Sequence, residues 1–203
     1  MSLPKTDPPY LLIVAGPNGS GKSSVYQGAD IEAFGRSVWI INPDLLAARI
    51  SEVENLAPRD GNLAAVQRIE AWLEASIRAH QTVGVETVLS TPKYRRLVEL
   101  AKGLGFQVRL IYVLLDTVQR NVERVRLRVR KGGHAVAEAD ILKRHARSLE
   151  QLPWFLAEAD QAWVFDNSSA SPRLIASKED GVVTLDKRPL PDIVEAVAKI
   201  RTE

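Results

Sequence analysis

Residues 11–23 read Leu11-Leu12-Ile13-Val14-Ala15-Gly16-Pro17-Asn18-Gly19-Ser20-Gly21-Lys22-Ser23, an apolar run that leads into a glycine-rich turn. Within this turn, the spacing of the glycines, the lysine and the last serine fits the phosphate-loop pattern G-x-x-x-x-G-K-S/T. The surroundings fit as well, because a buried-looking strand precedes the turn and residues 24–33 are compatible with a helix. The stretch therefore predicts that the chain binds a nucleoside triphosphate. A glycine-rich turn without a ligand is the alternative.

The chemistry of phosphate binding explains the residue types in this loop. Glycines let the backbone curl so that successive N–H groups point into one anion-sized hollow, and the following helix adds the positive end of its dipole. The lysine can reach the β- and γ-phosphates, and the serine hydroxyl can hold the Mg²⁺ ion that bridges them. We therefore expect a nucleotide site formed by Gly16, Pro17, Asn18, Gly19, Ser20, Gly21, Lys22, Ser23 and Ser24, with Lys22 also catalytic and Ser23 also a metal ligand.

Length and composition limit the class of protein. With 203 residues and a net charge of +2, the chain is long enough for one α/β domain and has no strong attraction for polyanions. It has no cysteine, which excludes disulfides, a thiolate nucleophile and a cysteine zinc site. No apolar run approaches the length of a membrane span, and residues 1–9 lack a signal-peptide core. We therefore predict a single cytoplasmic domain over residues 1–203 that binds neither nucleic acid nor a membrane.

Apolar strands alternate with helical patterns along the chain, which indicates a parallel sheet covered on both faces. The expected strands cover residues 10–15, 37–41, 83–88, 107–115 and 162–165, and a C-terminal hairpin covers 174–177 and 182–185. The main helices are expected at residues 62–79, capped by Asn62, and at 92–104, 138–149 and 191–201, with another after Asp116 or Thr117. The predicted fold is a P-loop NTPase three-layer α/β sandwich with a mainly parallel five-stranded sheet.

Carboxylates follow three of the predicted strands, at the edge where open α/β sheets bind ligands. Asp44 follows the second strand and is suited to accept the proton of an attacking hydroxyl, to cap the next helix, or both. Glu86 ends the third strand with Thr87, where it can hold Mg²⁺ or bind substrate, or pair with a lysine as a buried carboxylate. Asp116 follows the fourth strand as a competing Mg²⁺ candidate or as a helix cap.

Arginines cluster on both sides of Gly132-Gly133, a pattern typical of a helical lid that covers phosphates. Guanidinium groups suit the charge that spreads over a transferring phosphoryl group. We therefore expect a lid over about residues 128–147. The alternative is a solvated helix face whose arginines pair with Glu123, Glu138 and Glu150. Asn167, in the loop after the fifth strand, could lie beside a nucleotide base or belong to a plain turn.

At these residues the sequence resembles the zeta-toxin-like P-loop kinases, and especially the small bacterial members that are labelled as predicted ABC-type ATPases. The Leu-Ser-Gly-Gly-Gln signature of ABC proteins is absent from the sequence. The resemblance is carried by the phosphate loop, Asn42-Pro43-Asp44, Glu86-Thr87, Arg128-Val129, Gly132-Gly133-His134, Ile141 with Arg144, Arg147-Ser148-Leu149 and Phe165-Asp166-Asn167-Ser168.

The resemblance implies a phosphotransferase that uses ATP or GTP with Mg²⁺. In zeta toxins the acceptor is the 3′-hydroxyl of the sugar in UDP-N-acetylglucosamine, and an antitoxin protein is a potential partner. The resemblance also assigns roles. It makes Asp44 the catalytic base, Glu86 and Thr87 the substrate-binding pair, Arg128 and Arg144 the catalytic lid arginines, and Arg147 and Asn167 nucleotide-binding.

Two classes of function remain open at this point. The first is a kinase with a small-molecule acceptor, supported by Asp44 and the lid arginines. The second is a nucleotide-dependent ATPase or switch that acts through protein contacts and needs no acceptor pocket. A polynucleotide kinase is disfavoured because the net charge is close to neutral and no basic stripe contains interleaved aromatic residues.

Overall fold

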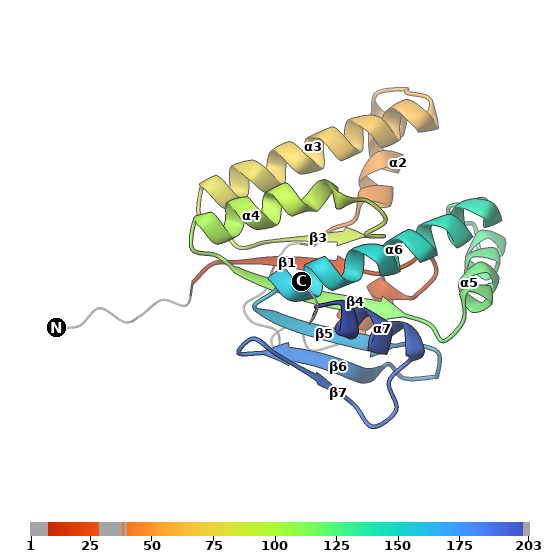
Figure 1. Cartoon of the computed structure of the whole chain (residues 1–203). Coiled ribbons are helices and arrows are strands. Elements are labelled where there is room, and N and C mark those ends of the chain that lie inside the picture. Colours follow the sequence, from red (N-terminus) through yellow and green to blue (C-terminus); the bar gives the residue numbers. More distant parts are fainter. Residues whose placement is uncertain (1–7, 29–37, 39, 201–203) are drawn as a thin grey trace.

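One seven-stranded sheet in the order β2-β3-β1-β4-β5-β6-β7 is the frame of the structure, a computed structural model (Figure 1). It describes residues 8–28, 38 and 40–200, and for residues 26–28, 44 and 58 it describes the backbone only. The first five strands are parallel, and the pairs β5–β6 and β6–β7 are antiparallel. The strands are β1 Tyr10–Ala15, β2 Ile40–Ile41, β3 Val83–Thr87, β4 Gln107–Leu114, β5 Gln161–Asp166, β6 Arg173–Glu179 and β7 Val182–Leu185.

This topology confirms the predicted P-loop α/β sandwich, and the C-terminal hairpin extends the same sheet. Figure 1 shows α3, α4 and α6 over one face of the sheet, where together with α7 they bury the larger core. A smaller core on the other face includes Val25 of α1, with Val38 packed against it. The helices are α1 Lys22–Gly28, α2 Pro43–Val53, α3 Pro58–Arg78, the 3₁₀ turn η2 Pro92–Tyr94, α4 Arg95–Gly103, α5 Val118–Arg130, α6 Glu138–Glu158 and α7 Pro191–Ile200.

Strand β1 lies between β3 and β4 and places the phosphate loop in the sheet. All of its residues are buried, as expected for a central parallel strand with helices on both faces. Its last residue, Ala15, is in register with Thr87 of β3 and with Tyr112 of β4. The loop that follows Ala15 therefore begins beside the carboxyl end of β3, where Glu86 lies.

Two predicted helix boundaries were wrong. The helix assigned to residues 62–79 begins earlier, at Pro58, so that Asn62 lies inside it and caps nothing. Proline at the first helical position needs no N–H partner, and this signal outweighs a later asparagine. Leu63, expected on the buried face, is 59% exposed. The helix assigned to 138–149 continues to Glu158 past Pro153, because the turns around this proline are buried in the core.

The helix after β4 is not capped by a side chain, contrary to both predicted caps. Thr117 occupies the N-cap position without a side-chain hydrogen bond to the helix. Asp116 instead pairs with Arg120 at 3.0 Å, four residues along.

The second strand was expected over residues 37–41, and only Ile40–Ile41 is a strand among the described residues of that range. The described residues contain no helix that is long and apolar enough to cross a bilayer.

The phosphate loop requires a backbone that only glycine adopts easily. Gly16 has a φ of +143° and Gly21 a φ of +86°. A Cβ atom built on Gly16 would overlap the carbonyl oxygen of Val113 in the neighbouring strand β4. The loop therefore passes so close to the sheet that no side chain fits at this position.

We expect Gly16→Ala to lower the free energy of unfolding by about 3 kcal/mol, because it adds both a backbone clash and a strained φ. The matched control is Gly103→Ala at the end of α4, where a Cβ would meet no atom within 4 Å. This control should change stability by less than about 1 kcal/mol, in the stabilising direction. Urea denaturation followed by circular dichroism measures both values, and equal effects of the two substitutions would contradict the argument.

Candidate active site

A cleft of about 560 Å³ lies at the carboxyl ends of β1, β2 and β3. Its walls come from the phosphate loop, the ends of β2 and β3, helix α3 and the two lid helices α5 and α6. The cleft brings together half of the predicted site residues, which are Asn18, Gly19, Lys22, Glu86, Thr87, Arg128, Arg144 and Arg147. Segments that are more than 100 residues apart in the chain therefore meet at one cleft.

Lys22 is buried and its ammonium group is directed at the phosphate loop itself. Its Nζ donates hydrogen bonds to the carbonyl oxygens of Gly16 at 2.7 Å and Pro17 at 3.2 Å. The same Nζ lies 4.0 Å from Oε1 of Glu86, which makes a long, buried ion pair. One of the two roles predicted for Glu86 was that of a buried carboxylate paired with a lysine, and Lys22 is such a partner.

Glu86 is the centre of a small polar cluster at the end of β3. Its Oε2 accepts hydrogen bonds from the hydroxyl of Ser23 at 3.1 Å and from the side-chain amide of Asn42 at 3.0 Å. These contacts explain how a carboxylate is tolerated near the end of a buried strand. Asn42 joins β2 to this cluster, a contact that the sequence pattern did not assign.

The cluster fits a Mg²⁺ ion of the kind that nucleotides bring with them. A hydroxyl oxygen and a carboxylate oxygen lie side by side, from Ser23 and Glu86. No group of three His, Cys, Asp or Glu side chains suited to a metal occurs within the described ranges. This donor set suits an ion that takes one carboxylate and completes its coordination with phosphates and water, as Mg²⁺ does.

Asp44 and Thr87 are the two remaining predicted residues at the strand ends. Asp44 is the second residue of α2, and its side chain lies outside the described part of the structure. The cap of α2 is Asn42, whose Oδ1 accepts a hydrogen bond from the N–H of Leu45 at 3.2 Å. Thr87 lines the cleft and its Oγ1 accepts a hydrogen bond from the N–H of Leu89, so its hydroxyl hydrogen can still be donated.

The lid arginines reach the cleft from both arms of the α5–α6 hairpin. Arg128, near the end of α5, donates a hydrogen bond to the carbonyl oxygen of His134 at 2.9 Å, across the Gly132-Gly133 turn. Arg144 and Arg147 lie on α6 and line the same cleft. Of the predicted acidic partners, Glu138 forms an ion pair with Arg126 rather than with a cleft arginine.

Two asparagines, Asn121 and Asn167, bond to the phosphate loop from its outer side, and Arg124 in turn bonds to the backbone of Asn167. Sequence reasoning missed Asn121 and Arg124. Asn121 of α5 is fully buried, and its amide donates to the carbonyl oxygen of Asn18 at 2.7 Å. The amide of Asn167 donates to the carbonyl oxygen of Ser20 at 2.9 Å, and Arg124 donates to the carbonyl oxygen of Asn167 at 2.7 Å. An asparagine on the apolar face of a helical pattern was the signal that could have identified Asn121.

Asn167 was predicted to bind nucleotide, and the structure places its amide against the loop backbone. A Cβ on Gly21 would overlap the nitrogen of this amide, so the two segments are packed tightly. Asp166 stabilises the turn that contains Asn167, because its Oδ1 accepts hydrogen bonds from the N–H and the hydroxyl of Ser168. Burial alone would raise the pKa of Asp166, but hydrogen bonds from Ser168 and Arg173 outweigh burial and lower it. Ser24, also predicted to bind nucleotide, is exposed in the first turn of α1.

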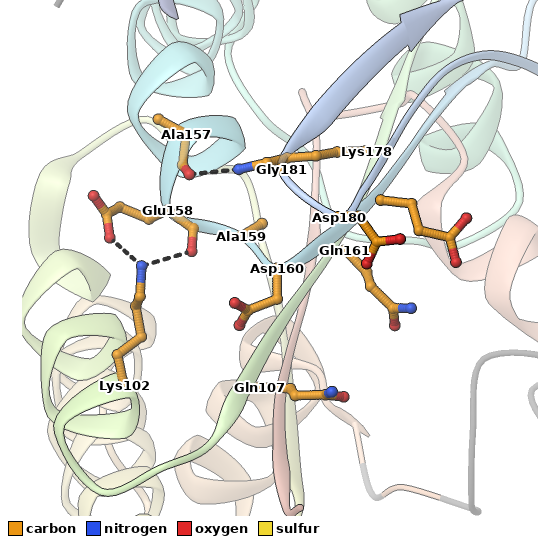
Figure 2. A pocket seen from close by; sticks show the side chains of 11 residues that line it. Lys102, Gln107, Ala157, Glu158, Ala159, Asp160, Gln161, Lys178, Asp180 and Gly181 are labelled. Carbon is orange, nitrogen blue, oxygen red and sulfur yellow. Dashed lines mark hydrogen bonds and ion pairs between the residues drawn. The ribbon is translucent and has the colours of Figure 1, made fainter.

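A second hollow, of about 340 Å³, lies at the opposite edge of the sheet, by the first residues of β4 and β5. Figure 2 shows Lys102 and Lys178 directed at the carboxyl end of α6. Lys178 donates to the carbonyl oxygens of Leu156 and Ala157, and Lys102 donates to the carbonyl and the carboxylate of Glu158. Burial lowers the pKa of Lys178. These lysines cap a helix, so this hollow is structural.

Comparisons with known proteins agree with this geometry. The family described as an AAA domain matches residues 11–152, which is more than half of the chain. An uncharacterized protein of Haemophilus influenzae is 30% identical over 134 residues, which cover 65% of this chain and 89% of that protein. The family match over residues 11–152 therefore includes the phosphate loop, the strand-end cluster and the lid.

Two solved structures share the fold at low sequence identity. The AvrRxo1-ORF1:-ORF2 structure with ATP has a TM-score of 0.64 and 17% identity, over 95% of this chain and 63% of that chain. This chain thus spans less than two thirds of the AvrRxo1 chain. A structure of the PezAT toxin-antitoxin system of Streptococcus pneumoniae has a TM-score of 0.65 and 12% identity, over 96% of this chain and 79% of that chain. The family match over residues 11–152, together with the phosphate loop and the sheet order, shows that the chain belongs to the AAA-domain family of P-loop proteins.

Proposed function

We propose that the chain is a phosphotransferase of the zeta-toxin type, which transfers the γ-phosphate of ATP or GTP to a hydroxyl group of a small molecule. The observation that supports it best is the single cleft that contains Lys22, Glu86, Arg128 and Arg144. A switch that acts through protein contacts needs a phosphate loop but no adjoining acceptor space. UDP-N-acetylglucosamine is the acceptor that the resemblance suggests, and it is the first one to test.

The nucleotide phosphates would bind along the loop. The backbone N–H groups of the phosphate loop, which Pro17 lacks, and those at the start of α1 would bind the phosphate oxygens. Lys22 would exchange its two carbonyl acceptors, Gly16 and Pro17, for the β- and γ-phosphates. Arg147 would bind the nucleotide phosphates from the lid. Ser23 and Glu86 would hold Mg²⁺, which supplies positive charge between the β- and γ-phosphates.

Transfer itself is an in-line displacement at the γ-phosphorus. The carboxylate of Asp44 accepts the proton of the acceptor hydroxyl, and the hydroxyl oxygen forms a bond to the γ-phosphorus. The bond between this phosphorus and the β–γ bridging oxygen breaks, so that the nucleoside diphosphate leaves with the electron pair. Arg128 and Arg144 stabilise the charge on the transferring group, and Thr87 with Glu86 orients the acceptor.

A protein partner that restrains the kinase belongs to the same proposal. The AvrRxo1 structures, which share this fold, contain ORF1 in complex with ORF2, and the PezAT structure belongs to a toxin-antitoxin system. An antitoxin that covers the cleft of this chain would block both nucleotide and acceptor.

The direct experiment measures transfer of labelled γ-phosphate from ATP with Mg²⁺, with and without UDP-N-acetylglucosamine. A phosphorylated sugar nucleotide is the expected product. Free phosphate alone, at a rate that neither this sugar nucleotide nor a panel of small hydroxyl compounds changes, would support the switch instead and count against a kinase.

Asp44→Asn should reduce transfer by about a thousandfold, because the amide cannot accept the hydroxyl proton. Binding of a nonhydrolysable ATP analogue should stay within about twofold, since Asp44 is assigned to the acceptor side. Calorimetric titration of the analogue and the transfer assay measure the two effects. Asp60→Asn, at an exposed acid in the first turn of α3, is the matched control. Normal transfer by Asp44→Asn would show that Asp44 is not the base.

Glu86→Gln should raise the Mg²⁺ concentration for half-maximal activity by about tenfold or more, because a charged ligand is lost. The amide oxygen of glutamine can still accept the hydrogen bonds from Ser23 and Asn42, so the fold should persist. A Mg²⁺ titration of the transfer rate, with the melting temperature as the control for folding, measures the effect. An unchanged Mg²⁺ dependence would leave Glu86 with the structural role alone.

A further inference from the structure

Asn42 lies between the Glu86 carboxylate and the start of α2. Strands β2 and β3 are parallel, and Ile41 is in register with Val85. The residues that follow these two, Asn42 and Glu86, are therefore level with each other at the carboxyl edge of the sheet. Pro43, directly after Asn42, is the first residue of α2. Asn42 thus joins the sheet to a helix, and it lines the cleft at this point.

The side-chain amide of Asn42 is engaged at both of its ends. Its Nδ2 donates a hydrogen bond to Oε2 of Glu86 at 3.0 Å, and its Oδ1 accepts one from the N–H of Leu45 at 3.2 Å. The flipped amide would place an oxygen against a carboxylate and an NH₂ group against an N–H, so these partners fix its orientation. An ionised aspartate at this position could cap the helix but has no hydrogen to donate. An amide of this length meets both demands.

The hydrogen bond from Asn42 to Glu86 differs from the one that Ser23 makes. Both side chains donate to Oε2, at 3.0 Å and 3.1 Å. The hydroxyl oxygen of Ser23 is an atom proposed to hold Mg²⁺, whereas the amide nitrogen of Asn42 is a donor and not a metal ligand. Hydrogen bonds of this kind orient the carboxylates that bind metals, and loss of one typically costs about 10- to 100-fold in metal affinity.

Helix α2 is held by packing in its later turns and by Asn42 at its start. Ala47 and Ile50 are buried in a small apolar cluster. Leu45, in the first turn, is 72% exposed, so its N–H is held by the Asn42 side chain and not by packing. Asp44 belongs to the same turn, as the second residue of α2. The place of the residue proposed as the base therefore depends on this cap.

We propose that Asn42 is a positioning residue, which fixes the Glu86 carboxylate with its NH₂ group and the first turn of α2 with its oxygen. Through this one amide, the residue proposed to hold Mg²⁺ and the proposed base Asp44 keep a defined relation to each other. The roles of Glu86 and Asp44 in transfer rest on the proposed function. The two hydrogen bonds of Asn42 rest on the structure alone.

Asn42→Ser and Asn42→Ala separate the two ends of the side chain. Serine caps helices about as well as asparagine, but its shorter side chain does not reach Glu86 from the cap position, and alanine makes neither contact. In the chain without nucleotide or metal, Asn42→Ala should lower the melting temperature by about 3 °C and speed up hydrogen exchange of the Leu45 amide. Asn42→Ser should keep both close to wild type. Calorimetry and NMR measure the two effects.

The Glu86 end is tested by binding, without catalysis. Calorimetric titration of a nonhydrolysable ATP analogue, with and without Mg²⁺, gives the factor by which Mg²⁺ tightens binding. Asn42→Ser and Asn42→Ala should both reduce this factor several-fold, because the carboxylate is no longer oriented. Asn62→Ser, the same substitution at an exposed position inside α3, is the matched control and should leave it unchanged. In a Glu86→Ala background, Asn42→Ser should change the factor by less than about twofold, since Asn42 acts through Glu86.

Transfer at saturating Mg²⁺ tests the α2 end. Asn42→Ser should keep kcat within about threefold of wild type, whereas Asn42→Ala should lower kcat about tenfold with little change in the KM for ATP, because the turn that contains Asp44 loses its cap. Equal kcat values for the two variants would overturn the link to the base.

An unchanged Mg²⁺ factor in Asn42→Ser, with wild-type binding of the analogue intact, would show that Asn42 caps α2 and does no more. Failure of the proposed function looks different. In that case the wild-type chain itself would not bind the ATP analogue, and the positioning role of Asn42 would be overturned together with the kinase.

Discussion

The structure depends on one constraint, which is that a loop with its N–H groups turned toward an anion must turn carbonyl groups toward the protein. Buried carbonyls need donors. Asn121 and Asn167 supply them to Asn18 and Ser20 from outside the loop. Lys22 supplies them to Gly16 and Pro17 from inside. The outer donors are fixed by packing, whereas the lysine is a mobile donor that a phosphate can attract away.

The same constraint connects the lid to the loop. Asn121 and Arg128 lie on one helix, about 10 Å apart along its axis at 1.5 Å per residue. The first is bonded to the phosphate loop and the second lines the cleft, where the Gly132-Gly133 turn orients it. Because α5 is bonded to the loop near its first turn, it holds Arg128 in a defined position relative to the phosphate loop.

Sequence patterns predicted the elements that local residue preferences determine, and they missed the helix ends and contacts that depend on residues distant in the chain. Strand β1 was predicted at its observed bounds because a fully buried central strand is an unbroken apolar run. The start of α3 and the end of α6 were misplaced, since Pro58 begins a helix and Pro153 sits inside one that tertiary packing maintains. The bonding partner of Asn121 could not be predicted, because it lies 103 residues away in the chain. The cleft confirms the proximity of Lys22 and Glu86, while the roles of these residues, and of Asp44, stay predictions.

The two hollows of the molecule show that charge alone does not mark a binding site. Both contain buried or half-buried lysines with lowered pKa values, Lys178 in one and Lys93 in the other. Lys178 donates to two helix carbonyls, so an anion would find an ammonium group that is already engaged. Lys93 has a ring face and a distant carboxylate, neither of which accepts a hydrogen bond from it. The hydrogen-bond partners of each lysine, and not its charge or burial, therefore distinguish the capped helix end from the cleft beside the phosphate loop.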